Sequence, residues 1–98
     1  MADLNITHNK QNMRFEVLLE GEKAFLEYRM REGDIAFMHT EVPEALGGKG
    51  IASALAVYAF KYAKDNNLPV IVYCPFVAAF LKRHPEYTVQ LDPKFIKH

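Results

Sequence analysis

The feature that most constrains the fold of this chain is a change of hydrophobic period at a cluster of glycines. Three of the five glycines, Gly47, Gly48 and Gly50, lie within the stretch GGKG. Before this cluster apolar residues alternate with polar ones, which predicts strands, and after it they recur at helical spacing. The sequence therefore predicts a sheet first and a strand-to-helix junction at the glycines.

Three strands are predicted before the glycines, over residues 13–20, 23–30 and 34–42. The connections between them are short, and short connections join antiparallel neighbours. In the third strand, strict alternation predicts one face formed by Ile35, Phe37, His39 and Glu41. The opposite face is also partly apolar, which favours a central position for this strand in the sheet.

The helix predicted after the glycines begins at Ile51 and ends near Asn66. A buried strand over residues 68–74 follows, and then a second helix that begins at Pro75. Residues 87–91 alternate again and are predicted as a last strand. The expected fold class is α+β, with a mixed, mostly antiparallel sheet and two helices in the C-terminal half of the chain.

Composition limits the kind of protein. With 98 residues, half of them hydrophobic, the chain is expected to form a single domain over residues 1–98. Its formal net charge is zero, so no general field attracts nucleic acid or acidic membranes. One cysteine, Cys74, excludes an internal disulfide, and no apolar run reaches the length of a membrane span. We expect a cytoplasmic protein without a metal site.

The glycine junction predicts an anion-binding site. A helix start exposes unpaired N–H groups, and glycine lets a phosphate approach them, although a plain flexible turn is the alternative. A Walker A loop does not fit, because Lys49 is followed by Gly50 rather than by Ser or Thr. A dinucleotide fingerprint is weak, because Ser53 stands where its third glycine belongs and the preceding strands are antiparallel.

A third pattern fits better. The stretch VPEALGGKGIASAL resembles the pyrophosphate loop of the GNAT superfamily of N-acetyltransferases, with Gly50 and Ala52 at the matching positions and Gly47 where Arg or Gln is usual. LPVIVYCPFVAAFLKRHPEY resembles the strand, helix and final segment that follow that loop. The chain is most similar to a minimal, short-chain subgroup of small bacterial and plant acetyltransferases, on the residues His39, Thr40, Val42, Pro43 and Cys74.

The resemblance implies acetyl-CoA as cosubstrate and an amine as acceptor. The residues that it implies for coenzyme A binding are Thr40, Val42, Gly47, Gly48, Lys49, Gly50, Ile51 and Ala52. The implied function is transfer of an acetyl group to that amine; the alternative is a non-catalytic module that binds coenzyme A or another protein. A small amine, a polyamine and a protein lysine all remain open as acceptors.

Three residues are candidates for the chemistry: His39, Glu41 and Cys74. His39 is a possible base, and Glu41, two residues away, a possible assistant, although both also fit ordinary strand positions. Cys74 precedes Pro75, so it is expected to begin a helix whose dipole favours a thiolate. It could accept the acetyl group, act as a base, or simply fill space as a small apolar residue.

Overall fold

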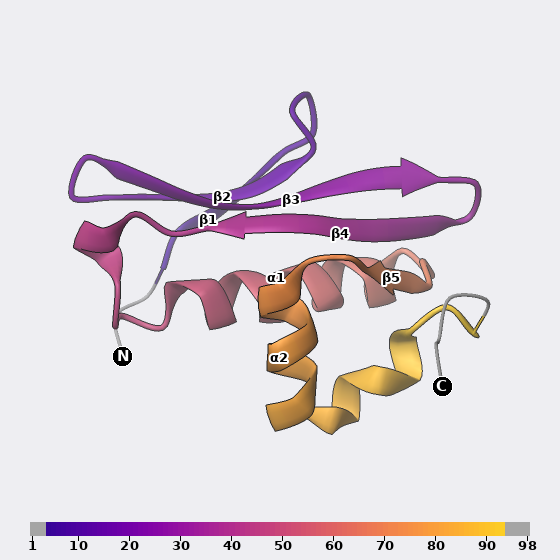
Figure 1. The fold of residues 1–98 in the computed structure, drawn as a ribbon. Coiled ribbons are helices and arrows are strands. Elements are labelled where there is room, and N and C mark those ends of the chain that lie inside the picture. Colours follow the sequence, from indigo (N-terminus) through magenta and orange to yellow (C-terminus); the bar gives the residue numbers. More distant parts are fainter. Residues whose placement is uncertain (1–3, 94–98) are drawn as a thin grey trace.

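The computed structural model describes residues 4–93. Five strands form one sheet in the order β1-β2-β3-β4-β5, and two α-helices and two 3-10 helices follow or interrupt them (Figure 1). The elements are β1 (Ile6–Asn9), β2 (Arg14–Leu19), β3 (Glu22–Arg31), β4 (Asp34–Glu41), η1 (Glu44–Leu46), α1 (Ile51–Asp65), β5 (Val70–Val72), α2 (Pro75–Arg83) and η2 (Pro85–Gln90). Strands β1 to β4 are antiparallel, and β5 is parallel to β4. The predicted α+β class is confirmed.

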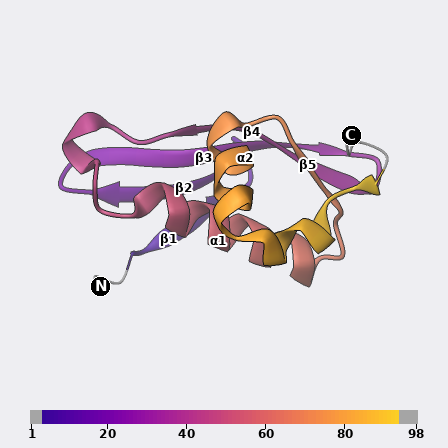
Figure 2. The same cartoon turned by 60° about the horizontal axis from the view of Figure 1, so that its bottom comes forward.

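Both α-helices lie on the same side of the sheet, which we call its core face (Figure 2). Side chains from β2 and β3 alternate as predicted, so that Phe15, Val17, Ala24 and Leu26 are fully buried against α1. Because these strands bury one face only, their polar residues lie on the opposite face. No α-helix among the described residues covers this second face, which we call the outer face.

A β-bulge at Met38 changes which residues of β4 share a face. Glu27 of β3 pairs with His39, but Tyr28 pairs with Phe37, so Met38 has no partner residue on β3. One extra residue reverses the alternation beyond it. The prediction that Phe37, His39 and Glu41 share a face is therefore wrong: Phe37 lies on the core face, whereas the other two lie on the outer face beside Glu27 and Phe25.

The two ends of the described chain differ from the sequence prediction. Strand β1, which the sequence did not predict, pairs with β2 along Ile6–Asn9. The predicted strand over residues 87–91 is instead the 3-10 helix η2, and only Leu91 forms an isolated bridge, with Val70. Pro85 fixes the first turn of η2, and Thr88 donates a hydrogen bond from Oγ1 to the Pro85 carbonyl, 2.7 Å away.

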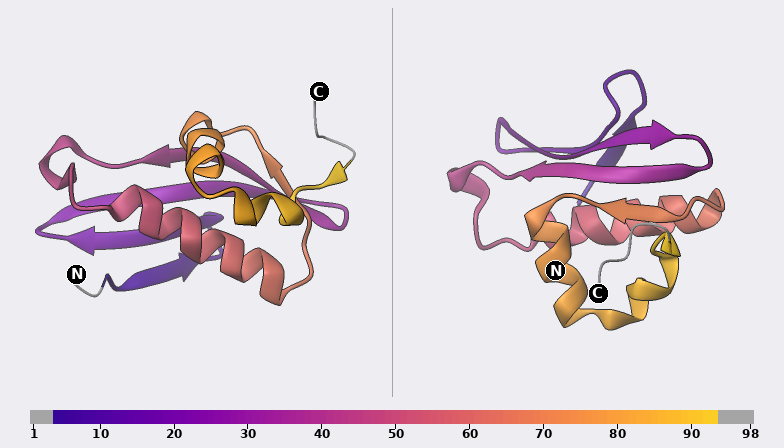
Figure 3. Two further views of the ribbon diagram at one scale, coloured as in Figure 1. Left: turned by 90° about the horizontal axis from the view of Figure 1, so that it is seen from below. Right: turned by 45° about the vertical axis from the view of Figure 1, so that its right-hand side comes forward.

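Helix α2 lies beside α1 on the core face, next to β4 (Figure 3). Aromatic rings join the sheet and the two helices: the Phe60 ring of α1 lies 5.2 Å from that of Phe37 on β4 and 6.2 Å from that of Phe80 on α2. The start of α2 lies close to the start of α1, where Phe76 and Ile51 line the same hollow. Within residues 4–93 no helix combines the length and the apolar content that crossing a membrane requires.

Candidate functional site

Strands β4 and β5 separate after three paired positions. Their ladder ends where Phe37 pairs with Val72, and the Phe37 carbonyl then accepts hydrogen bonds from the amides of both Tyr73 and Cys74, at 3.0 and 3.1 Å. Beyond that point β5 turns into α2, while β4 continues to Glu41. In the described part of the chain, residues 38–41 therefore have no strand on their β5 side. We call this separation the β4–β5 opening.

Cys74 and Thr40 close the core side of the β4–β5 opening. Cys74 is the N-cap of α2, as the sequence predicts, and its side chain is buried at 2% exposure. Its sulfur lies 3.3 Å from Thr40 Oγ1, close enough for a hydrogen bond in which either group donates. The bulge makes this contact possible, because it turns Thr40 toward the core face.

His39 and Glu41 lie on the outer side of the β4–β5 opening. Their side chains are exposed, and His39 Nε2 lies 3.3 Å from Glu41 Oε1. The His39 ring also meets the edge of Phe25, with 6.0 Å between ring centroids. The structure thus separates the three predicted catalytic residues: Cys74 faces the core and the other two face solvent, although all three border the same opening.

A hollow of about 280 Å³ lies at the N-terminus of α1. It is lined by Val42, Leu46, Gly47, Gly48, Gly50, Ile51, Ala52, Ser53 and Phe76. Gly50 is the N-cap of α1 at a φ of 74°, and no side chain caps this end of the helix. The first helical hydrogen bond runs from Ala54 N to Gly50 O, so the three preceding amides have no partner within the helix. They are free to bind an anion.

The hollow contains most, but not all, of the residues that the sequence predicts for coenzyme A. Lys49 points elsewhere, since its Nζ lies 3.7 Å from Glu20 Oε2 at the turn between β2 and β3. Thr40 lies at the opening with Cys74. Two residues were missed. Ser53 stands one position beyond the predicted loop, and Phe76 could be found only from the fold, because α2 brings it to the hollow.

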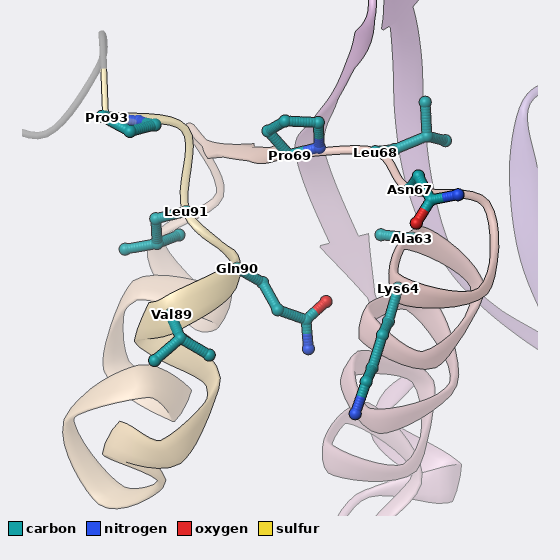
Figure 4. Close-up of a pocket in the computed structure, with 9 residues that line it drawn as sticks. All are labelled: Ala63, Lys64, Asn67, Leu68, Pro69, Val89, Gln90, Leu91 and Pro93. Carbon is teal, nitrogen blue, oxygen red and sulfur yellow. The ribbon is translucent and has the colours of Figure 1, made fainter.

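A separate pocket of about 370 Å³ lies at the other end of α1, between that helix and η2 (Figure 4). The Gln90 side chain extends from η2 into it, opposite Lys64 of α1. Its Oε1 is buried and has no hydrogen-bond partner within the described range 4–93. None of the predicted site residues lines this pocket. Among residues 4–93, no group of three or more His, Cys, Asp or Glu side chains could hold a metal ion.

The hollow and the β4–β5 opening suit an elongated ligand with an anionic middle. Unpaired amides at the start of α1 can bind the anion. The unpaired edge of β4 can accept an amide-containing chain in place of a strand. Such a chain would end at the opening, between Cys74 on one side and the His39–Glu41 pair on the other. Cys74 and the His39–Glu41 pair both contain groups that can accept or donate a proton.

Comparison with known proteins agrees with this arrangement. The sequence model of a family described as GCN5-related N-acetyl-transferase matches residues 14–91. Protein NATD1 of Danio rerio is 34% identical over 89 residues, which are 86% of this chain and 81% of that protein. Protein NATD1 of Bos taurus is 32% identical over 95 residues, which are 92% of this chain and 84% of that protein. The solution structure of a GCN5-like protein from Staphylococcus aureus matches with a TM-score of 0.74 and 26% identity, over 100% of this chain and 95% of that one.

Proposed function

The chain belongs to the GCN5-related N-acetyltransferase family, and from this membership we propose that it transfers the acetyl group of acetyl-CoA to an amine. One observation carries the proposal: the start of α1, which has no side-chain cap, lies next to the β4–β5 opening. Residues 4–46 contain no α-helix, which agrees with a minimal, short-chain member of the family.

The pyrophosphate of acetyl-CoA is proposed to bind at the N-terminus of α1. Ile51 and Ala52 line a hollow beside three glycines, and their amides have no partner within α1, so phosphate oxygens can approach the backbone there. Gly47 supplies backbone but no charged donor at the position where the family usually has Arg or Gln. Lys49 is held by Glu20 and contributes no direct contact in this arrangement.

The remaining affinity is proposed to come from the pantetheine arm. A helix N-terminus contributes about 0.3 to 2 kcal/mol toward an anion, far below the roughly 8 kcal/mol of a micromolar ligand. Pantetheine has two amides, and the unpaired edge of β4 from Met38 to Glu41, continued by Val42 just beyond the strand, offers backbone groups for them. This placement brings the thioester to the β4–β5 opening, between Thr40 and His39.

The amine is proposed to approach from the outer face, because α1 and α2 cover the core face. Its nitrogen attacks the thioester carbonyl, a C–N bond forms, the C–S bond breaks, and coenzyme A leaves as a thiolate. His39 accepts the proton that the amine loses, and Glu41, 3.3 Å away, orients the ring. For Cys74, on the opposite side and 3.3 Å from Thr40 Oγ1, we propose that it either receives the acetyl group first or acts as a base.

Thermal unfolding in the presence of acetyl-CoA, coenzyme A, ATP or NAD tests which of these compounds the native protein binds. Since a ligand stabilises the native state that binds it, the two coenzyme A forms should raise Tm and the other nucleotides should not. Release of coenzyme A thiol should then accelerate when an amine is added. The absence of any shift with acetyl-CoA would overturn the proposal, and a shift without thiol release would identify a binding module instead.

A matched pair of histidine variants tests the base. His39→Gln should lower kcat by about a hundredfold or more while acetyl-CoA affinity is retained. His84→Gln is the control, because the half-buried His84 at the end of α2 also lies near a glutamate, with 3.9 Å between its Nδ1 and Glu86 Oε2. Equal rates in both variants would exclude His39 as the base.

A further inference from the structure

The outer face of the sheet carries an arginine that is not engaged by a carboxylate. Arg14, on β2, lies with its guanidinium Cζ 4.0 Å above the centre of the Phe25 ring. Its Nε is buried without a hydrogen-bond partner, and no ion pair engages its guanidinium among residues 4–93. A cation in this position costs free energy to desolvate and gains only the ring in return.

The carboxylates nearest to Arg14 along the sheet are occupied by other groups. Glu27 is directly opposite Arg14 on β3, but its Oε2 lies 3.3 Å from Arg29 Nη1. Glu16 lies two residues along β2. Its Oε1 is 3.8 Å from Lys23 Nζ, and its Oε2 accepts a hydrogen bond from Asn9 Nδ2 at 3.3 Å. The guanidinium of Arg14 therefore remains the available positive charge in this part of the outer face.

Arg14 lies in line with the proposed base. Glu27 separates the two, since it is opposite Arg14 on one side and opposite His39 on the other. Two interstrand spacings place their Cα atoms about 10 Å apart. Beside Glu27, two residues along β3 on the same face, the Phe25 ring contacts both, at 4.0 Å from the Arg14 guanidinium and 6.0 Å from the His39 ring centroid. A basic group, an apolar ring and a proton acceptor thus follow one another across β2, β3 and β4.

We propose that Arg14 binds a carboxylate of the acceptor, so that the acceptor is a small aliphatic amine with an anionic group at its other end. This inference rests on the proposed acetyl transfer. The amine would lie at His39, the hydrocarbon chain over Phe25, and the carboxylate against the two Nη groups of Arg14. A diamine of the same length would place a second ammonium against the guanidinium, where like charges repel.

Three series of amines of equal length test the inference with acetyl-CoA and the whole protein. The ω-amino acids β-alanine, γ-aminobutyrate and ε-aminohexanoate are compared with the corresponding alkylamines and α,ω-diamines, each by its kcat/KM. In the wild type, at least one amino acid should exceed its alkylamine by about tenfold or more, since a hydrogen bond to a charged group is worth 1.5 to 3 kcal/mol. In Arg14→Met, which keeps an apolar stem over Phe25, that ratio should fall to about one.

Two further variants make the outcomes decisive. Arg14→Lys keeps the positive charge but lacks the two parallel donors of a guanidinium, so its ratio of amino-acid to alkylamine kcat/KM should be intermediate. This variant also tests the inference if Arg14→Met does not fold. Arg83→Gln removes the same charge from α2 and should leave the ratio as in the wild type. If alkylamines, diamines and amino acids are acetylated equally well, the inference fails while acetyl transfer stands. If none of these amines is acetylated, the inference fails, and acetyl transfer then stands only if a lysine-containing peptide accelerates the release of coenzyme A thiol.

Discussion

Thr40 Oγ1 lies 3.3 Å from Cys74 Sγ and links β4 to the start of α2 at the point where β4 and β5 separate. Cys74 is thus both a buried packing residue and a nucleophile candidate beside the proposed thioester position. The two roles make different predictions, because packing depends on size and chemistry depends on sulfur.

Replacing Cys74 by serine keeps the size of the side chain and its contact with Thr40. If sulfur takes part in the reaction, Cys74→Ser should bind acetyl-CoA as the wild type does but lose turnover by about a hundredfold or more. Steady-state kinetics and calorimetry measure the two quantities. An acetyl adduct on the wild type, found by intact mass without an amine, identifies the nucleophile. Full activity of the serine variant would mean that Cys74 only packs.

Alanine at Gly50 should weaken acetyl-CoA binding. Gly50 has a φ of +74°, and a Cβ there would project into open space where the pyrophosphate is proposed to lie. Gly21 offers a matched control, since its φ is +77° and its surroundings are also open, but it lies at the turn between β2 and β3. Both variants should lose about 1 to 2 kcal/mol of stability from backbone strain.

Only Gly50→Ala should also lose affinity, which calorimetry on both variants at a temperature below their transitions would measure. Equal affinity in the two variants would place the phosphate somewhere else.

Arginine at Gly47 should strengthen coenzyme A binding. Gly47 has a φ of −64°, which any residue adopts, and its Cβ would lie 3.2 Å from the Glu44 carbonyl, so a small local shift is needed. The added guanidinium should increase affinity by about 1 to 3 kcal/mol at low ionic strength and by less at high salt. Titration at two salt concentrations tests this. A dissociation constant that does not change at low salt would count against the proposed alignment of the loop.

Stability should fall as the pH is lowered, because of His8 on β1. Its Nε2 is within hydrogen-bond distance of the Tyr28 hydroxyl. Burial, and secondarily the charge of Lys10, lowers the pKa of His8 below its usual 6.5. The unfolded chain therefore binds a proton more readily than the native protein does. The contribution of His8 is fully present above about pH 7 and is lost as the pH falls through the lowered pKa.

Urea unfolding at pH 7.5 and pH 5.5, about one unit either side of the usual histidine pKa, should show a larger loss of stability in the wild type than in His8→Gln. His84→Gln, which removes a histidine at the end of α2 rather than on β1, is the control. An identical loss in the His8 variant and the wild type would assign the pH dependence to other groups.

The sequence was sufficient to predict the elements with strong periodicity. Alternation located β2 to β4, and helical spacing after the glycines located α1 and α2. Strand β1 and the 3-10 helices η1 and η2 were not predictable in this way. Strand β1 has four residues and η1 has three, which is too short for a periodic signal. The sequence of η2 alternates like that of a strand, but Pro85 and the hydrogen bond from Thr88 favour a 3-10 helix.

The sequence predicts local features of the candidate site, but not how its residues are arranged in space. The glycines before Ile51 and the cysteine before Pro75 are local signals for helix starts. In the structure Gly50 is the N-cap of α1 and Cys74 is the N-cap of α2. The side of the sheet on which each polar residue lies depends instead on the bulge, which alternation alone does not reveal. Arg14 and Phe25 were missed for a related reason, since only strand register brings them into line with His39.

The bulge at Met38 gives this strand an unusual tolerance to the loss of a residue. Loss of the Met38 codon keeps the reading frame and removes only the residue that has no partner on β3. Phe37 would stay opposite Tyr28 and His39 opposite Glu27, so Thr40 would still face the core and His39 and Glu41 would still face solvent. Lineages of this protein should therefore include members that lack a residue at this position as well as members that replace it.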